Sequence, residues 1–130
     1  MMIQGCEMDF GDTCAYPVRY EIWSVAFTEN DVIHNCRPSI IVGTNPDSDM
    51  VTVVPLTSQL CYRQKSTHLL VEGHGLEQTS RGLCEFVVTV PASRLRRQIG
   101  YLSDSFDRYA LRHALAVHLG LTEYDDCRGA

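Results

Sequence analysis

The sequence predicts a mainly β domain, in which a small antiparallel sheet curls on itself and one C-terminal helix follows. Short apolar runs rich in β-branched residues recur between residues 18 and 90. Proline, glycine and asparagine separate these runs at short intervals, which is typical of turns between neighbouring strands. Apolar residues recur at helical spacing only after Ser103.

The composition is that of one folded domain. The chain has 130 residues, of which 45% are hydrophobic and 21% charged. This balance supports a core and excludes global disorder. We expect residues 1–17 to be a weakly ordered N-terminal extension, residues 18–121 to be the folded domain, and residues 122–130 to be an acidic C-terminal tail.

The first three strands are expected at Val18–Phe27, Ser39–Val42 and Val51–Val54, where alternating or β-branched apolar residues stand. A polar loop, Thr28–Cys36, separates the first two strands. Pro55 should end the third strand, because proline has no N–H to donate to a ladder.

Further strands are expected at Thr67–Val71 and Leu83–Val90, and a last short strand at Ile99–Leu102. Between the last two, Pro91–Leu95 suits a single helical turn. These short strands, joined by short connections, complete the expected sheet.

The C-terminal helix should begin after an N-cap at Ser103, with Asp104 and Asp107 placed favourably at its N-terminus. Apolar residues at helical spacing continue to about Leu119, and Gly120 is suited to close the helix.

The charge of the chain is acidic overall, with a formal net charge of −5. This argues against a protein that holds nucleic acid by bulk electrostatics. The middle of the chain, 36–100, nevertheless carries seven basic and five acidic residues, so it is suited to meet a phosphate backbone. The N-terminus has no signal-peptide pattern, and no apolar run approaches the roughly 20 residues that cross a bilayer. We therefore expect a cytoplasmic protein without membrane contact.

The cysteines are scattered and form no C-x-x-C pair, so neither a zinc site nor a redox motif is indicated. We expect free thiols and neither a metal nor another cofactor. A cysteine-dependent sensor is a weaker alternative. The six residues are Cys6, Cys14, Cys36, Cys61, Cys84 and Cys127.

Two polar groups stand next to the second and third strands. Arg37 precedes the second strand, and Thr57, Ser58 and Gln59 directly follow the third. If these strands pair, Arg37 and Thr57 converge on one site. An arginine is always ionised and forks onto phosphate oxygens, so the pair suits a phosphate ligand.

The order of these segments resembles the MazF/PemK (Kid-like) toxins of bacterial type II toxin–antitoxin pairs. The resemblance covers about residues 19–121 and implies an SH3-like β-barrel that forms a homodimer. It also implies metal-independent cleavage of single-stranded RNA, growth arrest, and neutralisation by an extended antitoxin segment. The matching segments are Arg19–Trp23, Arg37–Val42, Val53–Gln59, Ser66–His68, Leu83–Glu85, Ser93–Leu95, Ile99–Asp104 and Ala114–Leu121.

The resemblance also implies roles for individual residues. Arg37 matches the family's RP-motif arginine and Thr57 its catalytic threonine. They would hold a phosphate while the adjacent ribose 2′-OH attacks it, which leaves a 2′,3′-cyclic phosphate and a 5′-OH. Ser58 and Gln59 would position the backbone or a base edge. Glu85 matches an acidic residue of the family's groove and would read a base.

His34 is a further candidate for contact with the RNA. Its unperturbed pKa is near neutral, so it is also a candidate general base. A solvated loop histidine is the alternative reading.

The sequence departs from the family at four places: the loop Thr28–Cys36 has no glycine, Pro91 stands where aspartate is common, and two departures concern the first strand and the groove. Tyr20 stands where the family usually has glycine, and Phe86–Thr89 replaces a run that contains a glutamine and an arginine. Phe86 and Val88 therefore suggest an alternative function: a toxin-fold module that has lost efficient cleavage but binds an antitoxin-like peptide.

Overall fold

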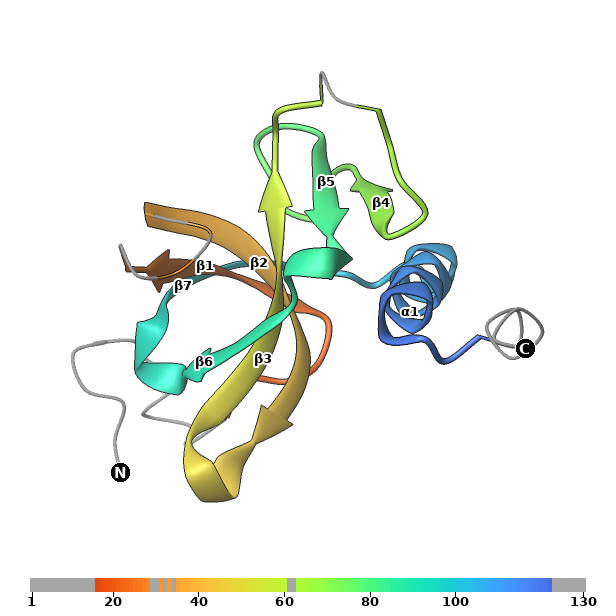
Figure 1. The fold of residues 1–130 in the computed structure, drawn as a ribbon. Coiled ribbons are helices and arrows are strands. Elements are labelled where there is room, and N and C mark those ends of the chain that lie inside the picture. The colour runs from red at the N-terminus through yellow and green to blue at the C-terminus, as the bar shows by residue number, and fades with distance from the viewer. Residues whose placement is uncertain (1–15, 29–30, 32, 34, 61–62, 123–130) are drawn as a thin grey trace.

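The sheet contains seven strands and is followed by one α-helix, α1 (Ser105–Leu119). The computed structural model describes residues 16–28, 31, 33, 35–60 and 63–122. Figure 1 shows α1 to one side of the sheet, beside β4. The strands are β1 (Glu21–Phe27), β2 (Asn35–Asn45), β3 (Met50–Thr57), β4 (His68–Val71), β5 (Ser80–Leu83), β6 (Val88–Pro91) and β7 (Leu95–Tyr101).

The strands follow the order β4-β5-β3-β2-β1-β7, and β6 pairs with β3 off this path. Each of these pairings is antiparallel. The mainly β class with one C-terminal helix is therefore confirmed. The sheet is curled but open, because β4 and β7, at the two ends of the strand order, do not pair with each other within the described residues.

β3 is shared by two partners along one of its edges. It pairs with β6 through Met50–Val53 and with β5 through Leu56–Thr57. Pro55 lies between these two stretches and opposite Ser39 of β2. The prediction that Pro55 ends the strand was wrong, because proline is tolerated where the ladder along one edge is already interrupted.

Other boundaries differ from the predicted ones. β2 begins at Asn35 and continues to Asn45. The predicted strand Leu83–Val90 is divided by a 3-10 turn, Cys84–Phe86, which buries Cys84. Apolar periodicity cannot detect such a turn, since both sides of it are apolar. The predicted helical turn after Pro91 is confirmed at Ala92–Arg94, and β7 begins directly after it.

The helix has the predicted extent and a different N-cap. Asp104, not Ser103, is the N-cap, and its side chain accepts a hydrogen bond from the backbone N–H of Phe106 at 3.0 Å. A carboxylate at this position also interacts favourably with the helix dipole. Gly120 closes the helix at a φ of 71°, as predicted.

The central strands bury alternate residues on two faces. We call them the helix face, which packs against α1, and the β6 face, which packs against β6 and the start of β7. The core of the helix face includes Ile22, Ile40, Val54, Leu56, Leu102, Leu111 and Ala114. The core of the β6 face includes Trp23, Val25, Ile41, Val53, Val90 and Leu95.

Tyr20, at the position where a glycine was expected, has a left-handed backbone with a φ of 79°. Its backbone bridges the sheet and the helix connection: its N–H donates to Ile41 O at 2.7 Å, and its carbonyl accepts from Leu102 N at 2.8 Å. The Arg108 guanidinium lies 4.3 Å from the centre of its ring, and Arg112 donates to its hydroxyl at 3.0 Å. These contacts hold a conformation that costs a non-glycine residue about 1–2 kcal/mol.

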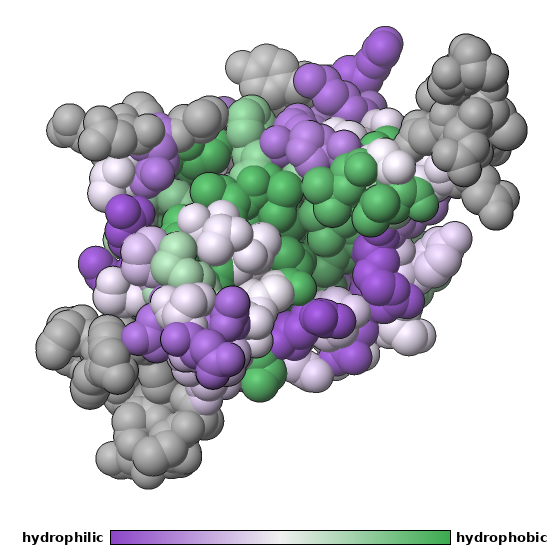
Figure 2. Space-filling view, turned by 60° about the horizontal axis from the view of Figure 1, so that its bottom comes forward, coloured by the Kyte–Doolittle hydropathy of each residue, from purple (hydrophilic) through white to green (hydrophobic). Residues whose placement is uncertain are grey.

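Part of the surface is apolar. Figure 2 shows a continuous apolar band across the centre of one face, bordered by polar side chains. No helix within the described residues is long and apolar enough to cross a membrane. The exposed large apolar residues are Val18, Leu60, Leu70, Tyr101, Phe106, Tyr109, Leu119 and Leu121.

Candidate active site

Arg37 lies near the start of β2, and Thr57 is the last residue of β3. The two strands pair with Ser39 opposite Pro55. Continuing this register by two residues brings Arg37 opposite Thr57. Opposite residues of an antiparallel pair project from the same face, so both side chains belong to the β6 face. Both residues are half-buried.

Arg81 extends this arrangement on the other side of Thr57. β5 pairs with β3 so that Arg81 is the direct partner of Thr57. Thr57 and Arg81 are thus neighbours on adjacent strands, and the extended β2–β3 register would add Arg37 to the same row. Arg81 is buried, with 7% of its surface exposed. Sequence reasoning missed it because the strand was expected to start at Leu83, which left Arg81 in a loop.

The threonine hydroxyl is positioned by the turn that follows β3. The backbone N–H of Gln59 donates to Thr57 Oγ1 at 3.1 Å. The hydroxyl oxygen is thus an acceptor inside the protein, and its own proton remains available for a ligand. Ser58 and Gln59 are exposed beside it, at the end of the strand where the sequence placed them.

Glu85 is held by β4 rather than by the Arg37–Thr57 row. Its carboxylate accepts from Thr67 Oγ1 and from His68 Nε2, both at 2.9 Å. The backbone N–H of Lys65 donates to His68 Nδ1 at 3.2 Å, so the proton of the neutral ring is on Nε2. Burial opposes ionisation of Glu85, but the hydrogen bonds from His68, its own backbone and Thr67 outweigh burial and lower the pKa of the carboxyl.

His34 lies outside the described residues. Within the described part of the chain, no group of three or more His, Cys, Asp or Glu side chains comes together as a metal site would require. The predicted roles of His34 and of Glu85 in contact with RNA stay predictions.

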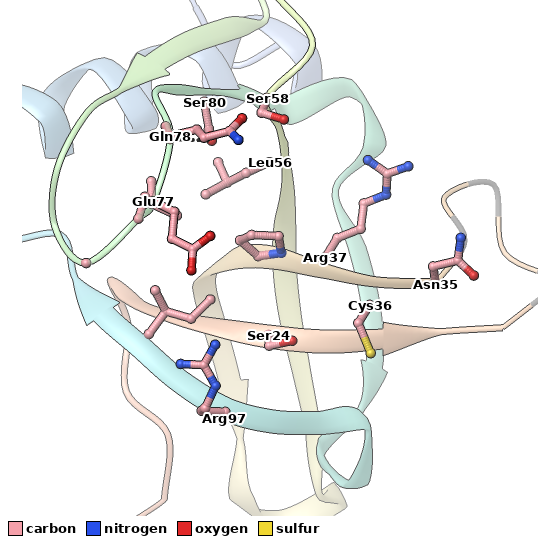
Figure 3. A pocket seen from close by; sticks show the side chains of 14 residues that line it. Ser24, Asn35, Cys36, Arg37, Leu56, Ser58, Glu77, Gln78, Ser80 and Arg97 are labelled. Carbon is pink, nitrogen blue, oxygen red and sulfur yellow. Dashed lines mark hydrogen bonds between the residues drawn. The ribbon is translucent and has the colours of Figure 1, made fainter.

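A cavity of about 510 Å³ lies on the helix face, next to Arg37. Its floor is a row across four strands, because Ser24 of β1 pairs with both Arg97 of β7 and Pro38 of β2, and the β2–β3 register continues the row to Leu56. Figure 3 shows Ser24 and Arg97 on one side of the cavity and Glu77 and Gln78 on the other. Its lining also includes Asn35, Cys36, Ser58, Gly75, Leu76, Ser80 and Ile99.

The wall formed by residues 75–78 is fixed to the sheet and to the helix. Gly75 and Gly100 pack backbone against backbone: a Cβ on Gly100 would lie 1.7 Å from His74 O. His74 Nε2 lies 3.0 Å from Asp107 Oδ2 of α1. Leu76 N–H donates to Gly73 O at 3.0 Å and closes the turn. The cavity therefore has a preformed wall.

A second cavity, of about 190 Å³, lies beside the 3-10 turn. It is mostly apolar, with two carboxylates at its border. Its lining residues are Phe27, Asp31, Ile33, Glu85, Phe86, Val87 and Val88.

Comparison with known proteins identifies the family. A model of the PemK-like, MazF-like toxins of type II toxin–antitoxin systems matches residues 18–117. The chain belongs to this toxin family. The match covers the sheet and most of α1, and the order of segments that indicated the family in the sequence is confirmed.

Solved structures of MazF toxins have the same fold. The Mycobacterium tuberculosis toxin MazF-mt6 is 30% identical, with a TM-score of 0.66 over 78% of this chain and 98% of that chain. MazF from Deinococcus radiodurans is 17% identical, with a TM-score of 0.69 over 82% and 98%. A mycobacterial endoribonuclease in complex with its cognate antitoxin is 22% identical, with a TM-score of 0.67 over 82% and 98%. No curated protein matches the sequence.

The departures from the MazF/PemK pattern at Tyr20 and at Phe86–Thr89 each have a structural counterpart. Tyr20 adopts the left-handed backbone that a glycine accepts without strain. Phe86 and Val88, which belong to the run that differs from the family pattern, line the small cavity and give it an apolar surface.

Proposed function

We propose that this MazF/PemK-family protein is a metal-independent endoribonuclease toxin that cleaves single-stranded RNA in the cytoplasm. The observation that supports the proposal is the antiparallel pairing of β2 with β3, the two strands that carry Arg37 and Thr57, in a chain of this family. An arginine and a hydroxyl donor on one face, at the end of two paired strands, suit a phosphate group that approaches from the surface.

The proposed chemistry is an attack of the ribose 2′-oxygen on the adjacent phosphorus. The new O–P bond closes a 2′,3′-cyclic phosphate, and the bond from phosphorus to the 5′-oxygen breaks. That oxygen takes up a proton from water and leaves as a 5′-OH. The proton of the 2′-OH passes to a base, for which His34 is the candidate. The Arg37 guanidinium stabilises the negative charge that develops on the phosphate. The Thr57 hydroxyl donates a hydrogen bond to a phosphate oxygen.

The test is incubation of the purified protein with a long single-stranded RNA in EDTA. Arg37→Ala should lower the cleavage rate by about 100-fold or more, because one stabilising donor of this kind is worth roughly that factor. Thr57→Ser keeps the hydroxyl and should keep most of the activity, whereas Thr57→Ala should lose it. Intact RNA with the folded wild-type protein, or wild-type rates in Arg37→Ala, would refute the proposal.

We also propose two protein partners, a second copy of the chain and an extended antitoxin segment. The continuous apolar band in Figure 2 supports an interface, since monomers rarely expose large contiguous apolar patches. A mycobacterial relative and a Deinococcus radiodurans relative are known in complex with an antitoxin. Sedimentation equilibrium should give twice the chain mass, and a single-chain mass would refute the homodimer.

The small apolar cavity favours a second candidate function, that of a peptide-binding module without efficient cleavage. Phe86 and Val88 offer an apolar surface to a peptide side chain, where a polar pair would suit RNA. Arg37→Ala separates the two functions. It should abolish growth arrest if the protein is a nuclease and leave it unchanged if the protein acts by binding a peptide.

A further inference from the structure

The cavity on the helix face offers more binding groups than a phosphate site needs. The polar side chains of its lining include those of Ser24, Ser58, Glu77, Gln78 and Arg97. Within the described residues, their side chains make none of the hydrogen bonds or ion pairs that hold the fold together. These polar groups are therefore available to a ligand.

The same cavity has an apolar floor and side. Pro38, Leu56, Leu76 and Ile99 contribute to its lining. Its volume of about 510 Å³ falls in the range of small-molecule sites, about 300–1,000 Å³. A flat ring can lie against such apolar side chains while its polar edge meets the border.

The cavity lies directly next to the Arg37–Thr57 row. Arg37 borders it, and the following residue, Pro38, belongs to its floor. Arg37 is two residues from the start of β2 and Thr57 is the last residue of β3. At a rise of about 3.3 Å per residue, Arg37 is about 7 Å from the start of its strand, and it lines the cavity itself. A phosphate at Arg37 and the base in the cavity can therefore belong to neighbouring groups of one RNA strand.

The charged groups define which base edge fits. Glu77 carries only acceptors and Arg97 only donors. Figure 3 shows Glu77 on the wall and Arg97 on the floor strand β7. Guanine offers the donors N1–H and N2–H₂ on one edge and the acceptors O6 and N7 on the next, and arginine binds O6 and N7 well. Adenine would present the lone pair of N1 to the carboxylate.

From these observations we infer that the cavity is a subsite for one guanine base of the RNA, next to the phosphate at Arg37. This inference rests on the proposed function. Glu77 accepts from N1–H and N2–H₂, Arg97 donates to O6 and N7, and the apolar floor packs against the ring. Sequence preference would then come from the segment between β4 and β5, whose position is fixed by the Gly75–Gly100 contact.

Binding to strands that cannot be cleaved tests the subsite apart from catalysis. Labelled 2′-fluoro oligonucleotides lack the attacking hydroxyl, so they report binding alone. A uridine decamer with one central guanine should bind the wild-type protein at least about fivefold more tightly than the same strand with adenine. Inosine, which lacks the N2 amino group, should give an intermediate affinity.

Glu77→Gln should reduce the difference between guanine and adenine, because the loss of the carboxylate weakens the contact with N1–H and N2–H₂ while Arg97 still binds O6 and N7. Glu72→Gln makes the same charge change on an exposed residue outside the cavity lining and should preserve the difference. Equal affinity for the two strands in the wild type, or an unchanged preference in Glu77→Gln, would overturn the inference. If the wild-type protein does not cleave RNA but binds the guanine strand selectively, the subsite is supported. Only the proposed reaction is then refuted.

Free guanosine 5′-monophosphate distinguishes a strand from a free nucleotide. As a competitor it should displace the labelled strand only at concentrations at least about tenfold higher than the unlabelled decamer, because it lacks the contacts of the neighbouring phosphates. Displacement at equal concentration would assign the cavity to a free nucleotide and overturn its assignment to RNA.

Discussion

The close approach of Gly100 to the 73–76 turn predicts that Gly100→Ala is strongly destabilising. The added Cβ would lie 1.7 Å from His74 O and 2.7 Å from His74 C, and both are backbone atoms. Contacts under 3.0 Å are essentially never seen for real Cβ atoms, so the turn must move by at least about 1 Å. Its movement also disturbs the hydrogen bond between His74 and Asp107, which fixes the turn to α1.

Overpacking of this kind costs about 1–3 kcal/mol, and loss of the attached contacts places Gly100→Ala near the upper end, at about 3 kcal/mol. For a domain of this size, that corresponds to a fall of roughly 10 °C in the melting temperature. Gly43→Ala is the matched control. Gly43 is also a strand glycine, and its added Cβ would meet Thr52 at an ordinary 3.6 Å.

Thermal unfolding followed by circular dichroism checks the prediction, with both variants at the same protein concentration. Gly43→Ala should unfold within a few degrees of the wild type, since alanine is tolerated in a strand at least as well as glycine. If Gly100→Ala melts within about 2 °C of Gly43→Ala, the turn does not pack rigidly on β7, and the reasoning about a preformed cavity wall is refuted.

Three further predictions concern other residues. Tyr20→Gly should be more stable than Tyr20→Ala by about 1 kcal/mol in urea unfolding, because both lose the ring but only alanine keeps the cost of a positive φ; the opposite order would contradict a left-handed Tyr20. The lowered pKa of Glu85 adds stability above its unfolded pKa of about 4.3, and this is lost as the pH falls through the folded pKa. Glu85→Gln should therefore destabilise the protein more at pH 7 than at pH 3, and an equal effect at both pH values would show that the charge is not involved. Burial, with the nearby charge of Glu85, raises the pKa of the Cys84 thiol to about 12, whereas Cys36 is exposed. Timed alkylation at pH 8 with peptide mass mapping should label Cys36 first, and rapid labelling of Cys84 in the folded protein would contradict its burial.

The sequence alone predicted the fold class, which the structure confirms, whereas the pairing of Arg37 with Thr57 at one site stays a prediction. Arg37 and Thr57 flank apolar strand segments, so the local pattern placed them near strand ends, and they lie near the start of β2 and at the end of β3. The helix and its closing Gly120 were also predictable, because helical spacing and a C-terminal glycine are local signals.

The remaining features depend on pairing between distant segments. Pro55 was misread because a strand that changes partners leaves no trace in its own sequence. Arg81 carries no local signal either; the partner that places it, Thr57, is more than twenty residues away in the chain. The contribution of residues 75–78 to the cavity wall follows from a backbone contact with β7, which is not a property of either segment by itself.

The alternation of side chains along β1, β2 and β3 also has a consequence for folding. Each of these strands supplies residues to both core clusters, so neither cluster can form while the strands of the other are unpaired. Partial unfolding that frees one face and preserves the other is therefore disfavoured, and we expect a single cooperative transition. A truncation such as Val53→Ala on the β6 face should lower protection from hydrogen exchange on the helix face as well.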